Sequence, residues 1–458
     1  MRLDLIKTKI KNIFNARPTV LIVLSFFLLI MAGTLLLMLP VSAKDGKGTN
    51  LLDALFTSTS ASCVTGLIVT DTYQHWTLFG QIVIISLIQI GGLGIITFAT
   101  FFYSLLGKKF RIRSMVLAQE SISFYSFQGI TRLIKNVMLV TFGTELIGAL
   151  LLSIRFVPEY GIKGLYLGVF HSIAAFCNAG FDLMSISGKG QFVSLLYYNN
   201  DPLVIYTVAS LIVIGGLGFV VWKDIYEYRK NKNLVLHTKL VITIVPVLIV
   251  LGAVVFFALE YNNPATLGKL DLPGKINASI FQSVTPRTAG FNSIDQNAMS
   301  DLSKLTTVIL MFIGAAPGST GGGIKVTTFG IVMIAILTQL RGSDDVIVFK
   351  RRISFPTIIK ALTIIGFSAM LVLVVTVIVV LLEGRPIINV LFEVVSAFAT
   401  VGLTTGMTPY LHPISKLLLI MMMFLGRVGP VTFALALTMI SHKNNTDIVY
   451  PEGKVIVG

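Results

Sequence analysis

The feature that most constrains this chain is a short segment that occurs four times, each time between two long apolar runs. Its copies are FTSTSASCVTGL (56–67), FHSIAAFCNAGF (170–181), FQSVTPRTAGF (281–291) and FEVVSAFATVGL (392–403). A phenylalanine precedes a glycine by ten residues in three copies and by nine in the third, and successive glycines are 114, 110 and 112 residues apart. A fixed period of this kind is typical of internal repeats, so the sequence predicts four equivalent units.

The apolar runs between these segments are long enough to cross a membrane. Charged residues make up only 12% of the chain, against about a quarter in soluble proteins. The run at 19–39 has 21 residues without a charge, which suffices for a hydrocarbon core about 30 Å thick. Pro40 follows it in place of a small-residue cleavage site, so we predict a retained span rather than a signal peptide. Eight spans are expected, at 19–39, 77–106, 136–154, 203–221, 240–260, 305–340, 361–382 and 417–440.

The positive charge predicts the topology. The net charge is +15, and 23 of the 36 Lys and Arg residues lie in five stretches, at 1–18, 107–135, 222–239, 341–360 and 441–458. Short loops rich in Lys and Arg stay in the cytoplasm. We therefore expect a multi-pass protein of the cell membrane with both termini cytoplasmic. Because the basic stretches recur between apolar runs, they indicate topology, and we expect no nucleic-acid partner.

Together these patterns predict an all-α integral membrane fold. Each unit consists of a span, a re-entrant pore loop and a second span, which gives eight transmembrane helices and four re-entrant half-helices around one pseudo-fourfold pore. Non-helical backbone at membrane depth is tolerated where protein buries it or water lines it. The predicted repeats cover 1–106, 107–235, 236–345 with a broken second span, and 346–458 with a cytosolic C-terminal tail.

The repeated segment has the chemistry of a cation filter. We expect a half-helix from Phe56 to about Ala61, with Asp53 as its N-cap. Four helix C-termini aimed at one point favour a cation, and glycine lets the neighbouring carbonyls turn inward, where they can replace a hydration shell. The alternative is that the glycines only pack helices, as we expect for GGLG at 91–94 and 215–218. The predicted filter is a short extended stretch in each unit: Val64, Thr65, Gly66; Asn178, Ala179, Gly180; Thr288, Ala289, Gly290; Thr400, Val401, Gly402.

Four motifs resemble the Trk/Ktr/HKT potassium-transporter superfamily, and most closely the membrane subunit of Ktr systems. They are SVTPRTAGFNS (283–293), LIQIGGLG (87–94), GGGIKVTTF (321–329) and FLGRVGPVTF (424–433), and the resemblance covers almost the whole chain. It implies sodium-dependent potassium uptake (symport), homodimers with one pore per protomer, and a cytosolic ring of regulatory subunits. The nucleotide would be bound by that ring, so we expect no cofactor on this chain. Some plant relatives carry Ser at the first filter glycine and favour sodium, so Gly66 implies potassium here.

The sixth predicted span is interrupted by GAAPGSTGGGIK (314–325). Proline and five glycines break a helix at membrane depth, and Ile324 before Lys325 excludes a phosphate loop. A kinked structural helix is one interpretation. The other, which the resemblance supports, is a flexible gate just below the filter. Its residues would be Gly314, Ala315, Ala316, Pro317, Gly318, Ser319, Thr320, Gly321, Gly322, Gly323 and Lys325.

Several charged residues lie close to the predicted pore. Arg427 falls within the last span, where a charge costs about 2.5–3.5 kcal/mol, so it either bonds nearby carbonyls or places positive charge below the filter. For Glu145 no partner can be assigned, and Arg287 is expected to turn away and anchor its loop on a carboxylate or carbonyls. Three acids that follow filters are either solvated or concentrate cations: Asp71, Asp182 and Asp295.

Other functions remain as alternatives. Only glycine is shared by all four filters, so a less selective sodium and potassium transporter is possible, as is a secondary transporter of another solute or a non-transporting scaffold. An enzyme is not expected, because the five histidines are scattered and the two cysteines, Cys63 and Cys177, have no metal-ligand spacing.

Overall fold

The computed structural model describes residues 18–94, 130–343 and 345–429. Within this part the chain is helical, apart from one antiparallel hairpin of two short strands, β1 (Ile347–Val348) and β2 (Arg351–Arg352). The basic stretches at 1–18 and 441–458, and most of the one at 107–135, lie outside the described residues.

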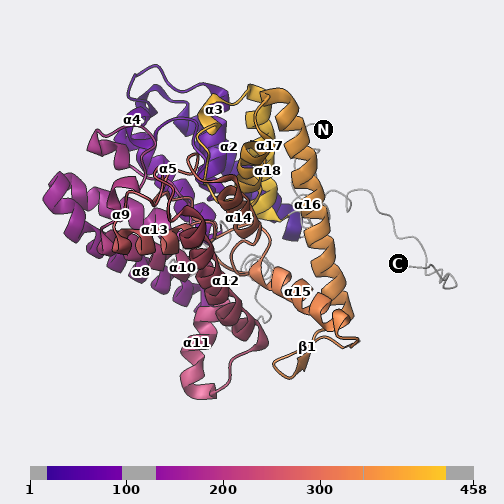
Figure 1. Ribbon diagram of the computed structural model, residues 1–458. Helices are drawn as coiled ribbons and strands as arrows, with labels where there is room; N and C mark the ends of the chain where they lie inside the picture. The colour runs from indigo at the N-terminus through magenta and orange to yellow at the C-terminus, as the bar shows by residue number, and fades with distance from the viewer. Residues whose placement is uncertain (1–17, 95–129, 344, 430–458) are drawn as a thin grey trace, which may run out of the picture.

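Each of the four units begins with one long helix (Figure 1). These helices are α2 (Pro18–Leu37), α8 (Ile130–Tyr160), α12 (Leu236–Glu260) and α16 (Phe355–Glu383). They are the four helices in the described part that are, by themselves, long and apolar enough to cross a membrane. Large apolar side chains stay exposed on them, such as Leu139 at 75% and Leu381 at 80%. A bilayer would cover these faces, so the first span of each predicted pair is confirmed as a helix.

A shorter helix follows each long one and corresponds to the repeated segment. The four short helices are α3 (Leu51–Ser62), α9 (Ile162–Phe176), α13 (Leu272–Val284) and α17 (Ile387–Phe398). With 12 to 15 residues, each is about 18–22 Å long and too short to span a bilayer. The re-entrant helices are therefore confirmed, although they are longer than predicted.

The start of α3 differs from the prediction. The helix begins at Leu51, and its N-cap is Asn50, whose side-chain oxygen accepts a hydrogen bond from the Asp53 backbone N–H at 2.9 Å. Asp53 lies in the first turn instead, where its carboxylate is favoured by the helix dipole. The expected N-cap role of Asp53 is wrong, because the extended Asn50 already satisfies the first-turn donor.

The second helices of the first, second and fourth units end before the predicted spans do, whereas the break in the second span of the third unit was predicted. The second helices are α5 (Leu78–Leu93), α10 (Pro202–Gly216), α14 (Asp301–Phe312) and α18 (Pro413–Val428). A glycine with positive φ caps two of them, Gly94 (80°) on α5 and Gly429 (95°) on α18, and Gly218 (91°) follows α10 as the N-cap of the next helix. After Gly218 the chain turns by 89° into α11 (Phe219–Asn231), and α14 is followed after a break by α15 (Val326–Leu340). The expected span residues 95–106 and 430–440 lie outside the described residues.

The units close into a ring in sequence order. The second helix of each unit packs against the short helix of the next, in the pairs α5 with α9, α10 with α13, α14 with α17, and α18 with α3. In the last of these pairs, the second helix of the fourth unit meets the short helix of the first unit. At this closure Lys416 Nζ lies 2.9 Å from Asp53 Oδ1. The pseudo-fourfold arrangement is therefore confirmed, while the exact repeat boundaries stay a prediction.

Glycines allow the second helices to approach the short helices closely. A Cβ atom on Gly91 would overlap the Ser62 carbonyl, and one on Gly215 would overlap the Phe176 carbonyl. The packing role expected of both GGLG motifs is thus confirmed. Gly426 lies against the Phe398 carbonyl in the same way, so the fourth unit uses the same contact.

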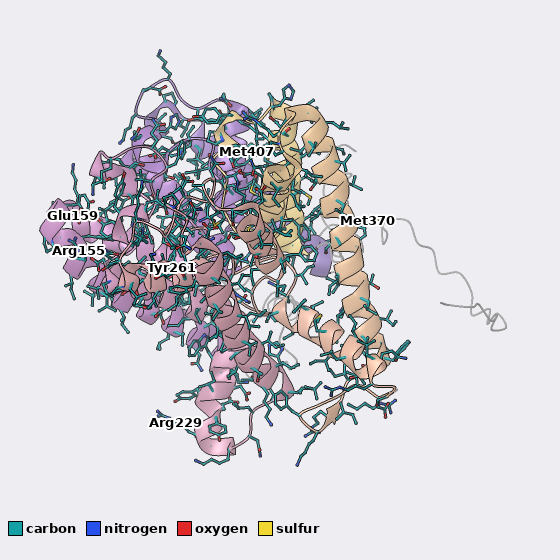
Figure 2. The ribbon with its side chains drawn as sticks, viewed as in Figure 1. Arg155, Glu159, Arg229, Tyr261, Met370 and Met407 are labelled. Atoms are coloured by element: carbon teal, nitrogen blue, oxygen red, sulfur yellow. The ribbon has the colours of Figure 1, made fainter. Side chains whose placement is uncertain are left out.

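The two described basic stretches lie at one end of the molecule. Arg229 on α11 and the β1–β2 hairpin are both at the lower end in Figures 1 and 2. The remaining short helical elements are α4 (Thr72–His75), η1 (Pro40–Ser42), η2 (Met184–Ser187), η3 (Leu196–Tyr198) and η4 (Thr408–Tyr410).

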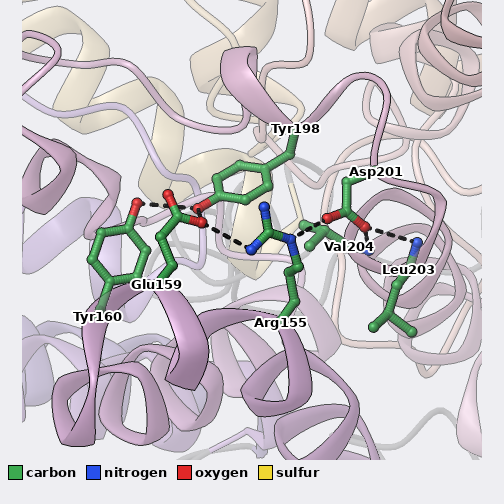
Figure 3. A network of polar contacts seen from close by, with 7 residues as sticks. All are labelled: Arg155, Glu159, Tyr160, Tyr198, Asp201, Leu203 and Val204. Carbon is green, nitrogen blue, oxygen red and sulfur yellow. Dashed lines mark hydrogen bonds and ion pairs between the residues drawn. The ribbon is translucent and has the colours of Figure 1, made fainter.

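A polar network fixes the second unit where α8 ends (Figure 3). Arg155 Nε donates to Asp201 Oδ2 at 2.6 Å, and its Nη1 lies 3.2 Å from Glu159. Tyr198 donates to Glu159 Oε2 at 3.1 Å. Asp201 also caps α10 by accepting from two backbone N–H groups of its first turn. The network therefore sets the position of α10 relative to α8.

We predict that Gly426→Ala lowers the thermal unfolding midpoint of the detergent-purified protein. The added Cβ would lie 2.8 Å from the Phe398 carbonyl carbon, and overpacking of this kind costs about 1–3 kcal/mol. Gly366→Ala is the matched control, because nothing lies within 4 Å of its added Cβ. Equal midpoints for the two variants would contradict the packing argument.

Candidate functional site

The four short helices end in the same hydrogen-bonded turn. We call the glycine that ends each predicted filter triplet the signature glycine. In each unit the residue just before it donates its backbone N–H to a carbonyl of the short helix. The acceptor is always the fourth residue after the shared phenylalanine. The bonds are Thr65 to Ser60 (2.7 Å), Ala179 to Ala174 (2.8 Å), Ala289 to Thr285 (3.0 Å) and Val401 to Ser396 (2.8 Å). The phenylalanine therefore sets the register in all four units, including the third, which is one residue shorter.

The backbone of these turns alternates in handedness. The first residue of each predicted filter triplet has positive φ: Val64 (58°), Asn178 (58°), Thr288 (65°) and Thr400 (52°). The third residue also has positive φ, from 67° at Gly180 to 93° at Gly66, whereas the second does not. The expected extended stretch is therefore wrong. Alternating handedness turns successive carbonyl groups toward one side, which a plain extended strand does not do.

Three of these positive-φ residues are β-branched, which is uncommon. Val64, Thr288 and Thr400 each carry a branch at Cβ, and the left-handed region costs such residues about 1–3 kcal/mol. Strain of this kind persists only where the surrounding structure imposes it, and it clusters at functional sites. The surrounding structure thus holds these turns in a backbone conformation that the local sequence disfavours.

The signature glycines meet around a single axis. A Cβ atom on Gly180 would lie 2.8 Å from the Ala289 carbonyl oxygen and 2.9 Å from the Gly290 Cα atom. The other three repeat this contact in cyclic order: Gly66 lies against the Ala179 carbonyl, Gly290 against the Val401 carbonyl, and Gly402 against the Thr65 carbonyl. All twelve predicted filter residues are buried. The structure therefore brings the whole predicted filter together, with no space for a side chain at the glycines.

A polar residue follows the shared phenylalanine in each unit, and the sequence analysis missed it. Glu393 accepts from the Thr404 and Thr408 hydroxyls at 2.6 and 2.7 Å and from the Thr405 N–H at 2.9 Å. Its counterparts are Thr57, His171 and Gln282. The signal was available, because one polar position recurs in four aligned apolar segments.

Two of these counterparts also bind the chain that leaves the filter. His171 Nε2 accepts from the Leu183 N–H at 3.3 Å, and the Gln282 and Gln296 amides pair at 2.9 and 3.0 Å. The Thr57 hydroxyl has no partner within the described part of the chain. In three units, therefore, the short helix is clamped to the segment after the filter.

The interrupted segment 314–325 lies directly against the filter turns. The Thr320 hydroxyl donates to the Phe176 carbonyl at 3.1 Å. The next residues meet the following units: Gly321 lies against the Thr288 hydroxyl, and a Cβ on Gly322 would be 3.0 Å from Thr400 Cγ2. The predicted gate residues and filter residues are thus neighbours.

The same segment is anchored at its neck and to the second unit. Ile313 and Ile324 form an isolated parallel bridge, in which the Gly314 N–H donates to the Ile324 carbonyl at 2.8 Å. The Ala316 N–H donates to the Gly216 carbonyl at 3.0 Å. Lys325 Nζ closes the loop by donating to the Gly321 carbonyl at 2.7 Å. These bonds replace the helical ones that proline and glycine remove.

Arg427 binds carbonyls on two sides of the pore axis. Its Nη1 donates to the Thr320 carbonyl, and its Nη2 donates to the Gly91 and Gly92 carbonyls at 2.5 and 2.9 Å. Of the two interpretations, bonding to nearby carbonyls is what the structure shows, and a charge effect below the filter stays a prediction. Arg427 therefore links α18, the interrupted segment and the end of α5.

Glu145 has a partner that the sequence did not reveal. Gln89 Nε2 donates to its carboxylate at 3.0 and 3.3 Å, and Cys177 Sγ lies 3.9 Å from the same carboxylate. These groups come from α5 in the first unit and from the end of α9 in the second. Local sequence could not assign a contact between residues 56 positions apart.

The other singled-out charges differ from the expectations. The buried Arg287 guanidinium has no hydrogen-bonding partner among the described residues, so the expected side-chain anchor is wrong; its carbonyl accepts from Asn178 Nδ2 at 3.1 Å instead. Asp71 is buried and accepts from the Gln74 and Phe192 N–H groups at 2.8 and 2.9 Å, so it is not solvated. The other two acids that follow filters also accept from the backbone. Asp182 accepts from the Met184 N–H at 3.0 Å, and the exposed Asp295 accepts from the Asn297 N–H at 2.9 Å.

Comparisons with known proteins agree with this geometry. Residues 5–447 match the profile of the TrkH family, described as cation transport protein. The chain is 42% identical to the Ktr system potassium uptake protein B of Bacillus subtilis, over 99% of both chains. It is 38% identical to the potassium/sodium uptake protein NtpJ of Enterococcus hirae, over 96% of this chain and 97% of that one. Its fold is similar to the crystal structure of the potassium transporter TrkH from Vibrio parahaemolyticus, with a TM-score of 0.71 at 18% identity, over 92% of this chain and 84% of that chain.

We predict that Glu393→Ala destabilises the protein more than Thr57→Ala, although both change the residue after the shared phenylalanine. Removing the carboxylate takes away the acceptor of three hydroxyls and one backbone N–H, at a cost of about 1–3 kcal/mol or more. The Thr57 hydroxyl has no such partner to lose in the described structure. Thermal unfolding of the two purified variants would show this, and a larger drop for Thr57→Ala would argue against the clamp.

Proposed function

Because the chain belongs to the TrkH family of cation transport proteins, we propose that it carries potassium ions across the cell membrane through the ring of four turns. The observation that carries this proposal is the cyclic contact of each signature glycine with the carbonyl before the next one. The names of relatives such as the Ktr system potassium uptake protein B support potassium as the ion.

Backbone oxygens would bind the ion. Rings of carbonyls can replace the hydration shell of a monovalent cation, and the four short helices end at the ring, where their dipoles favour positive charge. The predicted ligands are the carbonyls of the filter triplets at 64–66, 178–180, 288–290 and 400–402. The membrane potential would drive uptake with about 2.3 kcal/mol per charge for each 100 mV.

The segment 314–325 is the proposed gate. It lies against the filter residues Thr288 and Thr400 and against Phe176 at the end of α9, and its small residues leave little to obstruct a movement. Arg427 and Lys325 would hold it closed through carbonyl bonds that can break without leaving a buried carboxylate. The positive charge of Arg427 near the pore would also lower cation occupancy there and favour release of the ion.

The partners are proposed from the relatives. Names of the form Ktr system protein support a multi-subunit system, in which this chain would be the membrane subunit. We propose a homodimer on a cytosolic nucleotide-binding ring, which would dock on the basic end formed by α11 and the hairpin. Both termini would be cytoplasmic. Sodium dependence is supported by the name of the potassium/sodium uptake relative.

A second candidate is a less selective transporter of sodium and potassium. The same relative favours it, as does the sharing of glycine alone among the four filters. A secondary transporter of another solute receives less support, since the described pore region offers only backbone carbonyls and small side chains to a substrate.

Uptake of labelled rubidium into liposomes that contain the purified chain tests the proposal. Potassium should block the uptake much more strongly than sodium does. Equal block by both ions would favour the less selective transporter. If no uptake occurs even after the cytosolic partner is added, the proposed function is wrong.

We predict that Gly66→Ser and Gly290→Ser abolish the preference for potassium over sodium in this assay. A side chain at either position meets the backbone of a neighbouring unit and would widen the ring. Gly406→Ser is the control, because Gly406 has a similar φ of 86° but open space around it. Unchanged ion competition in the two filter variants would show that the glycines only pack the turns.

Arg427→Gln should raise rubidium uptake by the chain alone without changing the order of ion competition. The variant loses the charged bonds from α18 to the Thr320 carbonyl and to α5, so the segment would open more often. Arg229→Gln, on exposed α11 (Figure 2), removes an equal charge away from the pore. Uptake that falls in the first variant or rises equally in both would contradict the gate.

A further inference from the structure

An apolar cavity lies beside the neck of the interrupted segment. It has a volume of about 440 Å³ and lies between α14, α15, α16 and α17. Its walls include Ile313, Ile324, Val332, Ala369, Val372 and Val395, and every residue that lines it is apolar. Nothing in the pore pathway described above uses this space.

Water is a poor occupant of this cavity. A buried water needs two to four polar partners, and the lining offers none. Hydrocarbon is therefore the chemistry that fits.

The cavity is accessible from the surface that faces the bilayer. Three of its lining residues are largely exposed: Ile309 at 54%, Met333 at 40% and Leu373 at 60%. They lie on three different helices, so the opening is lateral, between α14, α15 and α16. A membrane lipid can thus enter without crossing the protein.

The depth of the cavity suits an acyl chain from the basic side. Val332 lies 8 residues from the end of α15 at Leu340, and Ala369 lies 14 residues from the start of α16 at Phe355. At about 1.5 Å per residue these distances are about 12 and 21 Å. Half of the hydrocarbon core measures about 15 Å, so the tail of a lipid in that leaflet reaches the cavity at the depth of Val332, and Ala369 lies deeper, toward the far end of the cavity.

Positive charge gathers where the headgroup of such a lipid would lie. The hairpin that joins α15 to α16 carries four exposed basic residues: Arg341, Lys350, Arg351 and Arg352. Arg352 pairs with Asp345 at 2.8 Å, whereas the other three have no ion pair within the described part. Basic clusters next to membrane helices attract anionic headgroups.

We propose that an acyl chain of an anionic phospholipid occupies this cavity, with its headgroup at the β1–β2 hairpin. The chain packs against Ile313 and Ile324, whose backbone bridge forms the neck of the segment 314–325. The bound lipid therefore supports the closed neck. The lipid site is inferred from the cavity and the basic residues alone. Its effect on transport rests on the proposed function.

Native mass spectrometry of the full-length protein tests the site, with phosphatidylglycerol and phosphatidylcholine of equal chain length as probes. The wild-type protein should retain phosphatidylglycerol preferentially. Ala369→Phe and Val332→Phe, which fill the cavity, should remove that retention. Val374→Phe is the control, because Val374 is 52% exposed on the same helix and does not line the cavity.

The headgroup is tested separately. Neutralising Lys350 and Arg351 together to Gln should weaken the preference for phosphatidylglycerol about twentyfold, as expected for two basic residues at a membrane surface. Neutralising Arg229 and Lys230 on α11 should leave it unchanged. Equal loss in both double variants would show non-specific charge attraction and overturn the assigned headgroup position.

Two further outcomes would overturn the proposal. Retention of phosphatidylglycerol by both cavity-filling variants would show that the lipid binds elsewhere. Loss of a dimer in these variants with lipid retention unchanged would show that a second copy of the chain covers the cavity. Rubidium uptake by Ala369→Phe, compared with uptake by Val374→Phe, then measures the effect of the lipid on the gate. If neither variant transports rubidium, the proposed function is in error, and the lipid site is not.

Discussion

The contact between a glycine and the carbonyl of the neighbouring unit is the constraint on which the rest of the structure depends. It occurs four times in cyclic order, at Gly66, Gly180, Gly290 and Gly402, and each copy excludes even a Cβ atom. Only four backbones without side chains can approach one axis so closely. In the proposed function the ring would present carbonyl oxygens rather than side chains, which is the chemistry that suits a monovalent cation.

The surrounding elements hold the ring against its own strain. The buried phenylalanines set the turn, the polar residues that follow them clamp the outgoing chain in three units, and glycines in the second helices allow close support from behind. The third unit departs from this plan. Its second helix is broken, and the freed segment lies against the filter turns of other units, tied to Arg427. The one unit that departs from the fourfold pattern therefore departs from it at the segment proposed as the gate.

The period and the Phe-to-Gly spacing predicted the short helices and the grouping of the filter residues, because each unit repeats one local pattern. The proline and glycines of 314–325 predicted the broken sixth span. The alternating φ of Val64 and Gly66 could not be predicted, since no local preference favours it. The Gln89 partner of Glu145 and the burial of Asp71 also depend on contacts between distant units. The same holds for the buried Arg287 guanidinium, which has no hydrogen-bonding partner among the described residues. The break at Gly218 was hidden because GGLG was assigned to packing alone, although glycine serves both roles.

The central claim is that backbone carbonyls at the glycine ring bind potassium. The most direct measurement is the anomalous scattering of rubidium in crystals of the full-length protein, grown with rubidium and compared with crystals grown in sodium alone. The account predicts a rubidium peak on the axis between Gly66, Gly180, Gly290 and Gly402, within reach of the carbonyls of the filter triplets. A ring that is empty of rubidium, with peaks only at acidic side chains elsewhere, would contradict it.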